Sequence, residues 1–194
     1  MPLSEAAQER ISLQSRVLWE NFESAHGGKY QPRNLLHPDN INAYGGVLLD
    51  FFDLCAQILI EDFEVVETNI LWANLESLRP EKTKNRAVSW LHWQFLGNSL
   101  RINIVLDHEC LLNAVPIQLQ HRLRTKLILH EIGHLYHWGY LATQPGFTRE
   151  ALPFHESEAW WFCFAVLGYC SAMCACEKKN NPEGGDMPPI WEMV

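Results

Sequence analysis

The sequence has little positive charge. It contains 15 Lys and Arg residues against 23 Asp and Glu residues, and its formal net charge is −8 at pH 7. Proteins hold nucleic acids largely through the phosphates, which requires a surplus of cationic side chains. The overall charge therefore argues against direct nucleic-acid binding.

Two further absences concern the cellular compartment. The first residues, Met1 to Glu5, contain no basic segment followed by an apolar run, so we expect no secretory signal and a cytoplasmic protein. None of the six cysteines forms a C-x-x-C pair, and in a reducing compartment we expect their thiols to be free. Cys163, Cys170 and Cys174 share one face of a predicted helix, where we interpret them as small buried apolar residues rather than a second metal site.

Long apolar runs are also scarce. One uncharged run, residues 159–176, would span about 27 Å as a helix, the lower limit for crossing a bilayer. Gly168, Ser171 and several Ala and Cys residues dilute its hydrophobicity, and an all-round apolar helix also suits the centre of a small domain. We therefore favour a buried core helix over a membrane span.

Apolar residues make up 47% of the 194 residues, which is enough for one folded domain. We expect a single domain over residues 1–177, with N-terminal helices in residues 1–62 and a catalytic core in residues 85–177. Pro, Gly and Asn are frequent in residues 178–194, which we expect to form a flexible tail.

Hydrophobic periodicity and turn residues predict a mainly helical α+β fold. The predicted helices cover four segments, residues 4–24, 47–61, 116–138 and 154–177. Ser4 is suited to cap the first helix, and Gly139 to stop the third. Residues 88–96 and 100–106 are predicted to pair as a hairpin across a Gly-Asn-Ser turn, whereas residues 63–78 are ambiguous. The sequence therefore predicts a small antiparallel sheet before the third helix.

His130-Glu131-Ile132-Gly133-His134 has the pattern H-E-x-x-H within the third predicted helix. Histidines four residues apart stand one turn apart on the same face, so both imidazoles can reach one ion. Glu131 is rotated by about 100° from His130, which lets it flank the ion without binding it and take a proton from the catalytic water. Two nitrogens, a carboxylate and an open position for water suit zinc. We interpret the pattern as a zinc site rather than two histidines on a solvated helix face.

The third ligand has to come from another element. His137 lies about 10.5 Å along the helix from His130, so three ligands on one straight helix cannot surround an ion. We therefore place His137 beside the ion's ligands or in the pocket. His137 and Tyr140 also replace the Gly and His of the metzincin extension, which excludes that class. The remaining candidates are His155, Glu150, Glu156 and Glu158. Because Glu156 and Glu158 are about 200° apart on the final helix, only one can face the motif, and helical geometry leaves both open.

Together these residues resemble the ImmA/IrrE family of zinc metallopeptidases. That family carries H-E-x-x-H on one helix and, some twenty-odd residues later, an E-x-x-A-N-x-F-A-like segment, which matches residues 156–163 here. The resemblance places the third ligand at Glu156. Trp160 stands where Asn is usual, which implies loss of a hydrogen bond behind the metal ligands, and the family's common Leu-Met-Pro after this helix is absent.

The resemblance covers roughly residues 85–170 and implies a small cytoplasmic gluzincin with a zincin-like fold. It makes strand 100–106 the edge strand above the metal, where an extended peptide could be bound by strand addition. Family members often cleave or inactivate a helix-turn-helix repressor encoded nearby. Residues 1–84 do not read as such a DNA-binding domain, so a repressor would be a separate partner.

We therefore expect a zinc metallo-endopeptidase in which His130, His134 and Glu156 hold Zn²⁺ and Glu131 is the general base. The residue that stabilises the oxyanion stays open among Tyr136, His137, Tyr140 and His155. The alternative function is a catalytically weak regulator that keeps the zinc fold and binds a partner protein, which the Trp at position 160 favours.

Overall fold

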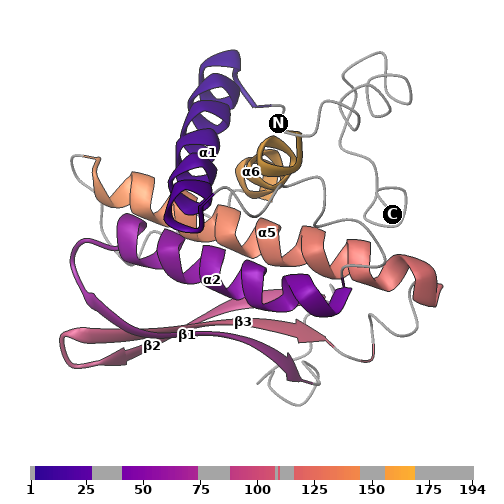
Figure 1. The fold of residues 1–194 in the computed structure, drawn as a ribbon. Helices are drawn as coiled ribbons and strands as arrows, with labels where there is room; N and C mark the ends of the chain where they lie inside the picture. The colour runs from indigo at the N-terminus through magenta and orange to yellow at the C-terminus, as the bar shows by residue number, and fades with distance from the viewer. Residues whose placement is uncertain are drawn as a thin grey trace, which may run out of the picture.

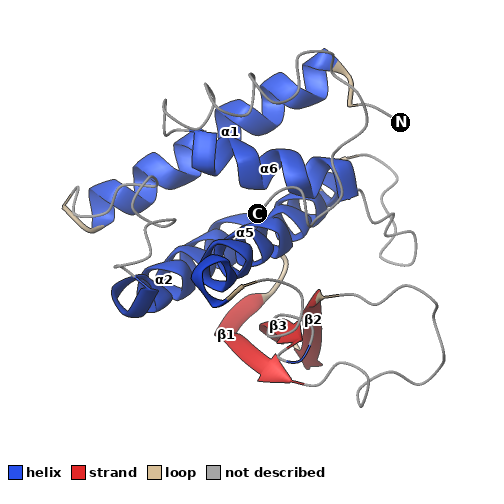
Figure 2. Cartoon of the chain, turned by 90° about the vertical axis from the view of Figure 1, so that its right-hand side faces the viewer, coloured by secondary structure: helices blue, strands red, loops and turns tan. Residues whose placement is uncertain are grey.

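The computed structural model describes residues 3–27, 41–73, 88–107, 109, 116–144 and 156–168. These residues form four helices and three strands in three layers (Figure 1, Figure 2). One outer layer holds α1 (Glu5–Ala25) and α6 (Glu156–Gly168), and the middle layer holds α2 (Ile41–Leu59) and α5 (Ile117–Ala142). The other outer layer is the sheet of β1 (Glu64–Ala73), β2 (Ser89–Leu96) and β3 (Ser99–Asp107). The predicted α+β class is confirmed.

The sheet is mixed, with the strand order β1-β3-β2. β2 and β3 form the predicted antiparallel hairpin, with Gly97 in its turn at φ +69°. β1 lies in the ambiguous segment 63–78 and pairs with β3 in parallel, so the prediction of an antiparallel sheet is wrong for this strand. Its alternation is hard to read from sequence because the register shifts between Val65 and Glu67.

β3 is the central strand, which corrects the prediction that residues 100–106 form an edge. Leu100, Ile102, Ile104 and Leu106 are completely buried. On the same face, Trp93 of β2 pairs with Ile102 and contacts Trp138 of α5, with ring centroids 5.0 Å apart. The middle helices therefore cover this face of the sheet, and the free edges belong to β1 and β2 among the described residues.

Two helix boundaries differ from those predicted, both at glycines. α1 begins after Ser4, whose Oγ accepts a hydrogen bond from the Ala7 N–H at 3.3 Å, as predicted. α2 begins at Ile41, before the glycine pair that was expected to precede it, and α5 continues through Gly139 to Ala142. Only part of the predicted helix 154–177 falls in the described residues, where α6 ends at Gly168.

Gly139 serves a close helix contact rather than a helix stop. A Cβ at this position would lie 2.7 Å from the backbone oxygen of Leu59, the last residue of α2. Backbone cannot yield to such an overlap as a flexible side chain can. The glycine therefore lets the end of α2 rest directly on α5.

The described cysteines fit the expectation of buried thiols. Cys55 lies in α2, and burial raises the pKa of its thiol. Cys163 lies in α6, and its Sγ donates to the Lys126 backbone oxygen at 3.4 Å. The other four cysteines and the predicted tail 178–194 lie outside the described residues. Within those residues, each helix is too short or too polar to cross a membrane.

Replacing Gly139 with Ala tests the contact between α2 and α5. Helix propensity alone favours Ala by about 1 kcal/mol, but the overlap with Leu59 has to be relieved. We expect G139A to lower the free energy of unfolding by about 1–3 kcal/mol, measured by urea denaturation. Gly46 of α2 has no atom within 4 Å of an added Cβ, so G46A is the matched control and should stabilise by about 0.5–1 kcal/mol. Equal or higher stability of G139A would contradict this role of Gly139.

Candidate metal site

The site is built where α6 crosses α5 at very short distance. A Cβ on Gly133 of α5 would lie 2.6 Å from the backbone oxygen of Ala159 and 2.7 Å from its Cα. The absence of a side chain at position 133 therefore lets the two backbones touch. His130 and His134 flank Gly133 on α5, and Glu156 lies one turn before Ala159 on α6, so the contact brings all three side chains together.

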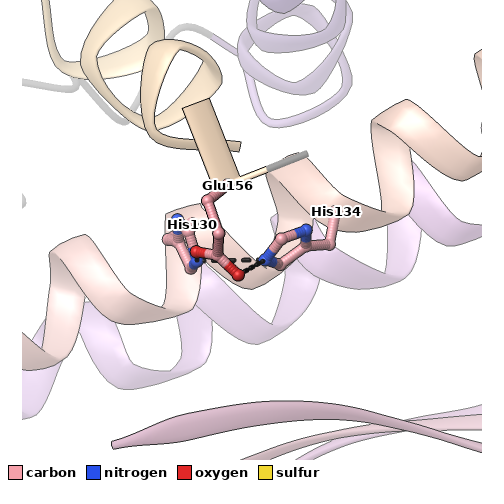
Figure 3. Close-up of side chains that lie close together, drawn as sticks. All are labelled: His130, His134 and Glu156. Atoms are coloured by element: carbon pink, nitrogen blue, oxygen red, sulfur yellow. Dashed lines mark hydrogen bonds and ion pairs between the residues drawn. The ribbon is translucent and has the colours of Figure 1, made fainter. Parts of the chain in front are cut away.

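His130, His134 and Glu156 converge on one point (Figure 3). The Nε2 atoms of the two histidines lie 3.0 Å apart. Oε2 of Glu156 is 3.2 Å from Nε2 of His130, and Oε1 is 3.5 Å from Nε2 of His134. The structure thus brings together the three residues predicted as metal ligands.

The donor set fits zinc in both chemistry and spacing. Ligand atoms at about 2.0–2.2 Å from one tetrahedral ion are about 3.3–3.6 Å from each other. The distance between the two nitrogens is 3.0 Å, and the nitrogen–oxygen distances of 3.2 and 3.5 Å end on different oxygens of Glu156; all three are near that range. Two imidazoles and one carboxylate leave a fourth position, as catalytic zinc requires.

Glu156 is the accessible member of the cluster. Its side chain is 64% exposed, whereas the histidine side chains are 6% and 10% exposed. Hydrogen bonds from His130 and His134 hold the pKa of its carboxyl well below the usual range. Glu156 therefore offers a carboxylate rather than a neutral acid, which is the form that binds a cation.

Glu158 holds the helices together instead of joining the cluster. Its Oε2 accepts a hydrogen bond from His137 Nδ1 of α5 at 2.5 Å and from an Arg10 guanidinium N–H of α1 at 3.1 Å. Trp161 adds a second link from α6 to α1, because its Nε1 donates to the Gln8 backbone oxygen at 3.1 Å. These contacts place Glu156, rather than Glu158, beside His130 and His134.

Glu131 is buried, and its contact was not foreseen from sequence. Ser89, the first residue of β2, donates its hydroxyl to Glu131 Oε1 at 2.5 Å. The two residues are 42 positions apart, and a serine at the start of a strand carries no sequence signal for such a bond. The hydroxyl ties the predicted general base to an edge strand of the sheet.

Trp160 packs directly on a predicted metal ligand. Its ring lies 4.1 Å from the His130 imidazole between centroids, at an interplanar angle of 33°. The other ring nitrogen of His130, Nδ1, is buried and has no hydrogen-bond partner among the described residues.

Three of the four residues considered for oxyanion stabilisation have other contacts in the structure. The Tyr136 hydroxyl donates to Gln14 of α1, and burial raises the pKa of Tyr136 to about 12. The guanidinium carbon of Arg10 lies 3.5 Å from the centroid of the Tyr140 ring. His137 is bonded to Glu158, as described above. His155 and Glu150 lie outside the described residues.

Comparisons with known proteins do not assign this chain to a family. No protein-family model matches the chain, and searches of curated proteins and of solved structures return no significant match. The resemblance to the ImmA/IrrE family therefore stays a prediction from the residue pattern.

The variants E156A and E158A distinguish the predicted metal ligand, Glu156, from Glu158, the carboxylate that links the helices. Removing Glu156 should weaken zinc binding by more than about a hundredfold, since even partners behind the ligands contribute about 10- to 100-fold. Because Glu156 is exposed but accepts hydrogen bonds from both histidines, the free energy of unfolding of the metal-free protein should fall by about 0.5–1.5 kcal/mol, less than in E158A. Zinc affinity is measured by competition with a chromophoric chelator.

E158A should instead lower the free energy of unfolding by about 2–4 kcal/mol, because it leaves buried polar groups of Arg10 and His137 without their acceptor. Its effect on zinc affinity should be much smaller than that of E156A. The opposite pattern in the two variants would reassign the ligand to Glu158.

Proposed function

We propose that this protein is a zinc-dependent metallo-endopeptidase of the ImmA/IrrE type, with a zincin-like catalytic core. The observation that carries the proposal is the convergence of His130, His134 and Glu156, with Glu131 beside them on the same helix turn. His130, His134 and Glu156 would hold the ion. Bound zinc supplies Lewis-acid polarisation of a peptide carbonyl and lowers the pKa of a water molecule.

In this proposal Glu131 is the general base. Its Oε1 is occupied by the Ser89 hydroxyl, so Oε2 is the atom left to accept a proton from water. Later in the reaction, the same carboxyl can pass its proton to the leaving amine.

The substrate strand would add to β2. β2 is a sheet edge among the described residues, and its first residue contacts Glu131. An extended peptide that hydrogen-bonds to this edge would therefore run past the general base. The partner edge, β1, is tied to α2 through a hydrogen bond of 3.0 Å from Thr68 to Asp53, at the side of the sheet away from β2.

A helix-turn-helix repressor is the substrate class that fits the charge of this chain. DNA-binding proteins carry basic surfaces, and this protein has a net charge of −8. Opposite net charges accelerate the encounter of two proteins and favour one class of partner over acidic proteins. The repressor would bind DNA, and this protein would act on the repressor in the cytoplasm.

The variant E131Q tests the enzymatic function. Gln keeps the size of Glu but cannot accept a proton, so zinc content should stay at about one ion per chain. Cleavage of an unstructured peptide library, followed by mass spectrometry, should fall about 10²- to 10⁴-fold. A zinc-loaded wild-type protein that cleaves neither the library nor a co-encoded repressor would overturn the enzymatic proposal. Undiminished repressor inactivation by E131Q would instead support the regulator that acts by binding.

The pair S89A and S89T tests how the base is held. S89A removes the donor to Glu131 Oε1, and we expect kcat to fall about tenfold with zinc content unchanged. S89T keeps the hydroxyl and should retain activity within about threefold of wild type. An equal loss in S89T would show that keeping the hydroxyl does not preserve the rate, and would contradict the proposed role of the hydrogen bond.

A further inference from the structure

We infer that Trp160 is a positioning residue that fixes the His130 imidazole by a close ring contact, in place of the hydrogen bond that usually orients a histidine ligand. The inference rests on the metal site of the proposed function but not on peptide hydrolysis. It concerns how strongly, and in which orientation, this chain holds its ion.

The first observation is the unsatisfied nitrogen. A histidine that binds metal through one ring nitrogen almost always donates its other N–H to a carboxylate, carbonyl or water, which fixes the tautomer and the ring orientation. His130 turns Nε2 toward Glu156 and His134, so Nδ1 is the atom that would need such an acceptor. Nδ1 is buried without a hydrogen-bond partner in the described parts of the chain. Among the described residues, no hydrogen bond at Nδ1 therefore restricts rotation of the His130 imidazole.

The second observation is the ring that covers this imidazole. The centroids of Trp160 and His130 are 4.1 Å apart and their planes are inclined by 33°, which is a close, tilted contact between the two rings. The indole is itself held in place, since it is only 7% exposed and stacks against Phe164 with centroids 6.0 Å apart. A fixed indole plane limits the rotation of the imidazole about its side-chain bonds.

Trp160 lies next to the residue of α6 that makes the close contact with α5. Trp160 follows Ala159, the residue whose backbone touches Gly133 of α5. The contact that brings Glu156 to the histidines therefore also sets the indole over His130. The close approach of α5 and α6 therefore brings Glu156 to the histidines and also places Trp160 against His130.

The test compares the zinc affinities of W160F and W160L with that of the wild type. Phe keeps an aromatic face over His130, whereas Leu keeps apolar volume without a ring. We expect W160F to bind zinc within about twofold of wild type and W160L to bind about three- to tenfold more weakly, the range that one aromatic pair contributes. Affinity is measured with zinc alone against a chromophoric chelator, on protein whose folding is checked by circular dichroism.

A second measurement reports the contact itself. The indole ring current should shift the imidazole C–H proton resonances of His130 upfield in the zinc-loaded wild type. W160L should remove this shift, and W160F should retain most of it. The control is W161L, which changes the next residue of the same helix, one that contacts α1 instead of the metal ligands. W161L should leave zinc affinity within about twofold of wild type.

The possible outcomes separate this inference from the proposed function. Wild-type affinity in W160L, or equal weakening in W160L and W161L, would overturn the positioning role while leaving the metal site intact. A loss in W160F as large as that in W160L would also overturn it. Failure of the wild type to bind zinc would overturn the metal site and, with it, the proposed function.

Discussion

The rest of the candidate site depends on the backbone contact between Gly133 of α5 and Ala159 of α6. An added Cβ would lie 2.6 Å from a backbone oxygen, so the helices can take this separation only with glycine at position 133. Side chains within one turn of a helix crossing are the ones that can meet across it. His130 and His134 lie within one turn on one helix, and Glu156 on the other. The close approach of the two backbones thus accounts for the short distances among the three candidate metal ligands.

The two carboxylates of α6 make different contacts: Glu156 lies with the candidate metal ligands, and Glu158 links the helices. Glu158 is 12% exposed and joins α5 and α1 through His137 and Arg10, so its charge is matched inside the protein. Glu156 is exposed, and its contacts are the two histidines. A site that gathers ligands for an ion contributes little packing by itself. Glu158 supplies packing through its hydrogen bonds with His137 and Arg10, and Trp160 supplies it through its contact with His130.

Ser89 of β2 connects the sheet to the helix that carries the two histidines. Because β1 pairs with β3 in parallel, β3 becomes central and β2 is left with a free edge among the described residues. Ser89 at the start of β2 bonds Glu131, so this edge and the proposed general base are joined by one hydroxyl. A substrate strand on β2 and the group that would act on it therefore share a common support.

Much of this could be predicted from sequence, because helical and strand periodicity are local. The spacing of His130 and His134 places both on one face wherever the helix packs, and the β2–β3 hairpin follows from alternation around a glycine turn. Partners from distant segments could not be predicted in this way. Glu156 and Glu158 both reach histidines of α5, and packing decides which carboxylate lies beside His130 and His134. Ser89 reaches Glu131 from 42 positions away, and the register shift in β1 hides its alternation. Gly139 looks like a helix stop, yet it is a contact, because the need for glycine there comes from Leu59 in another helix. Local sequence thus determined which side chains can bind a metal, and tertiary packing decided which of them meet.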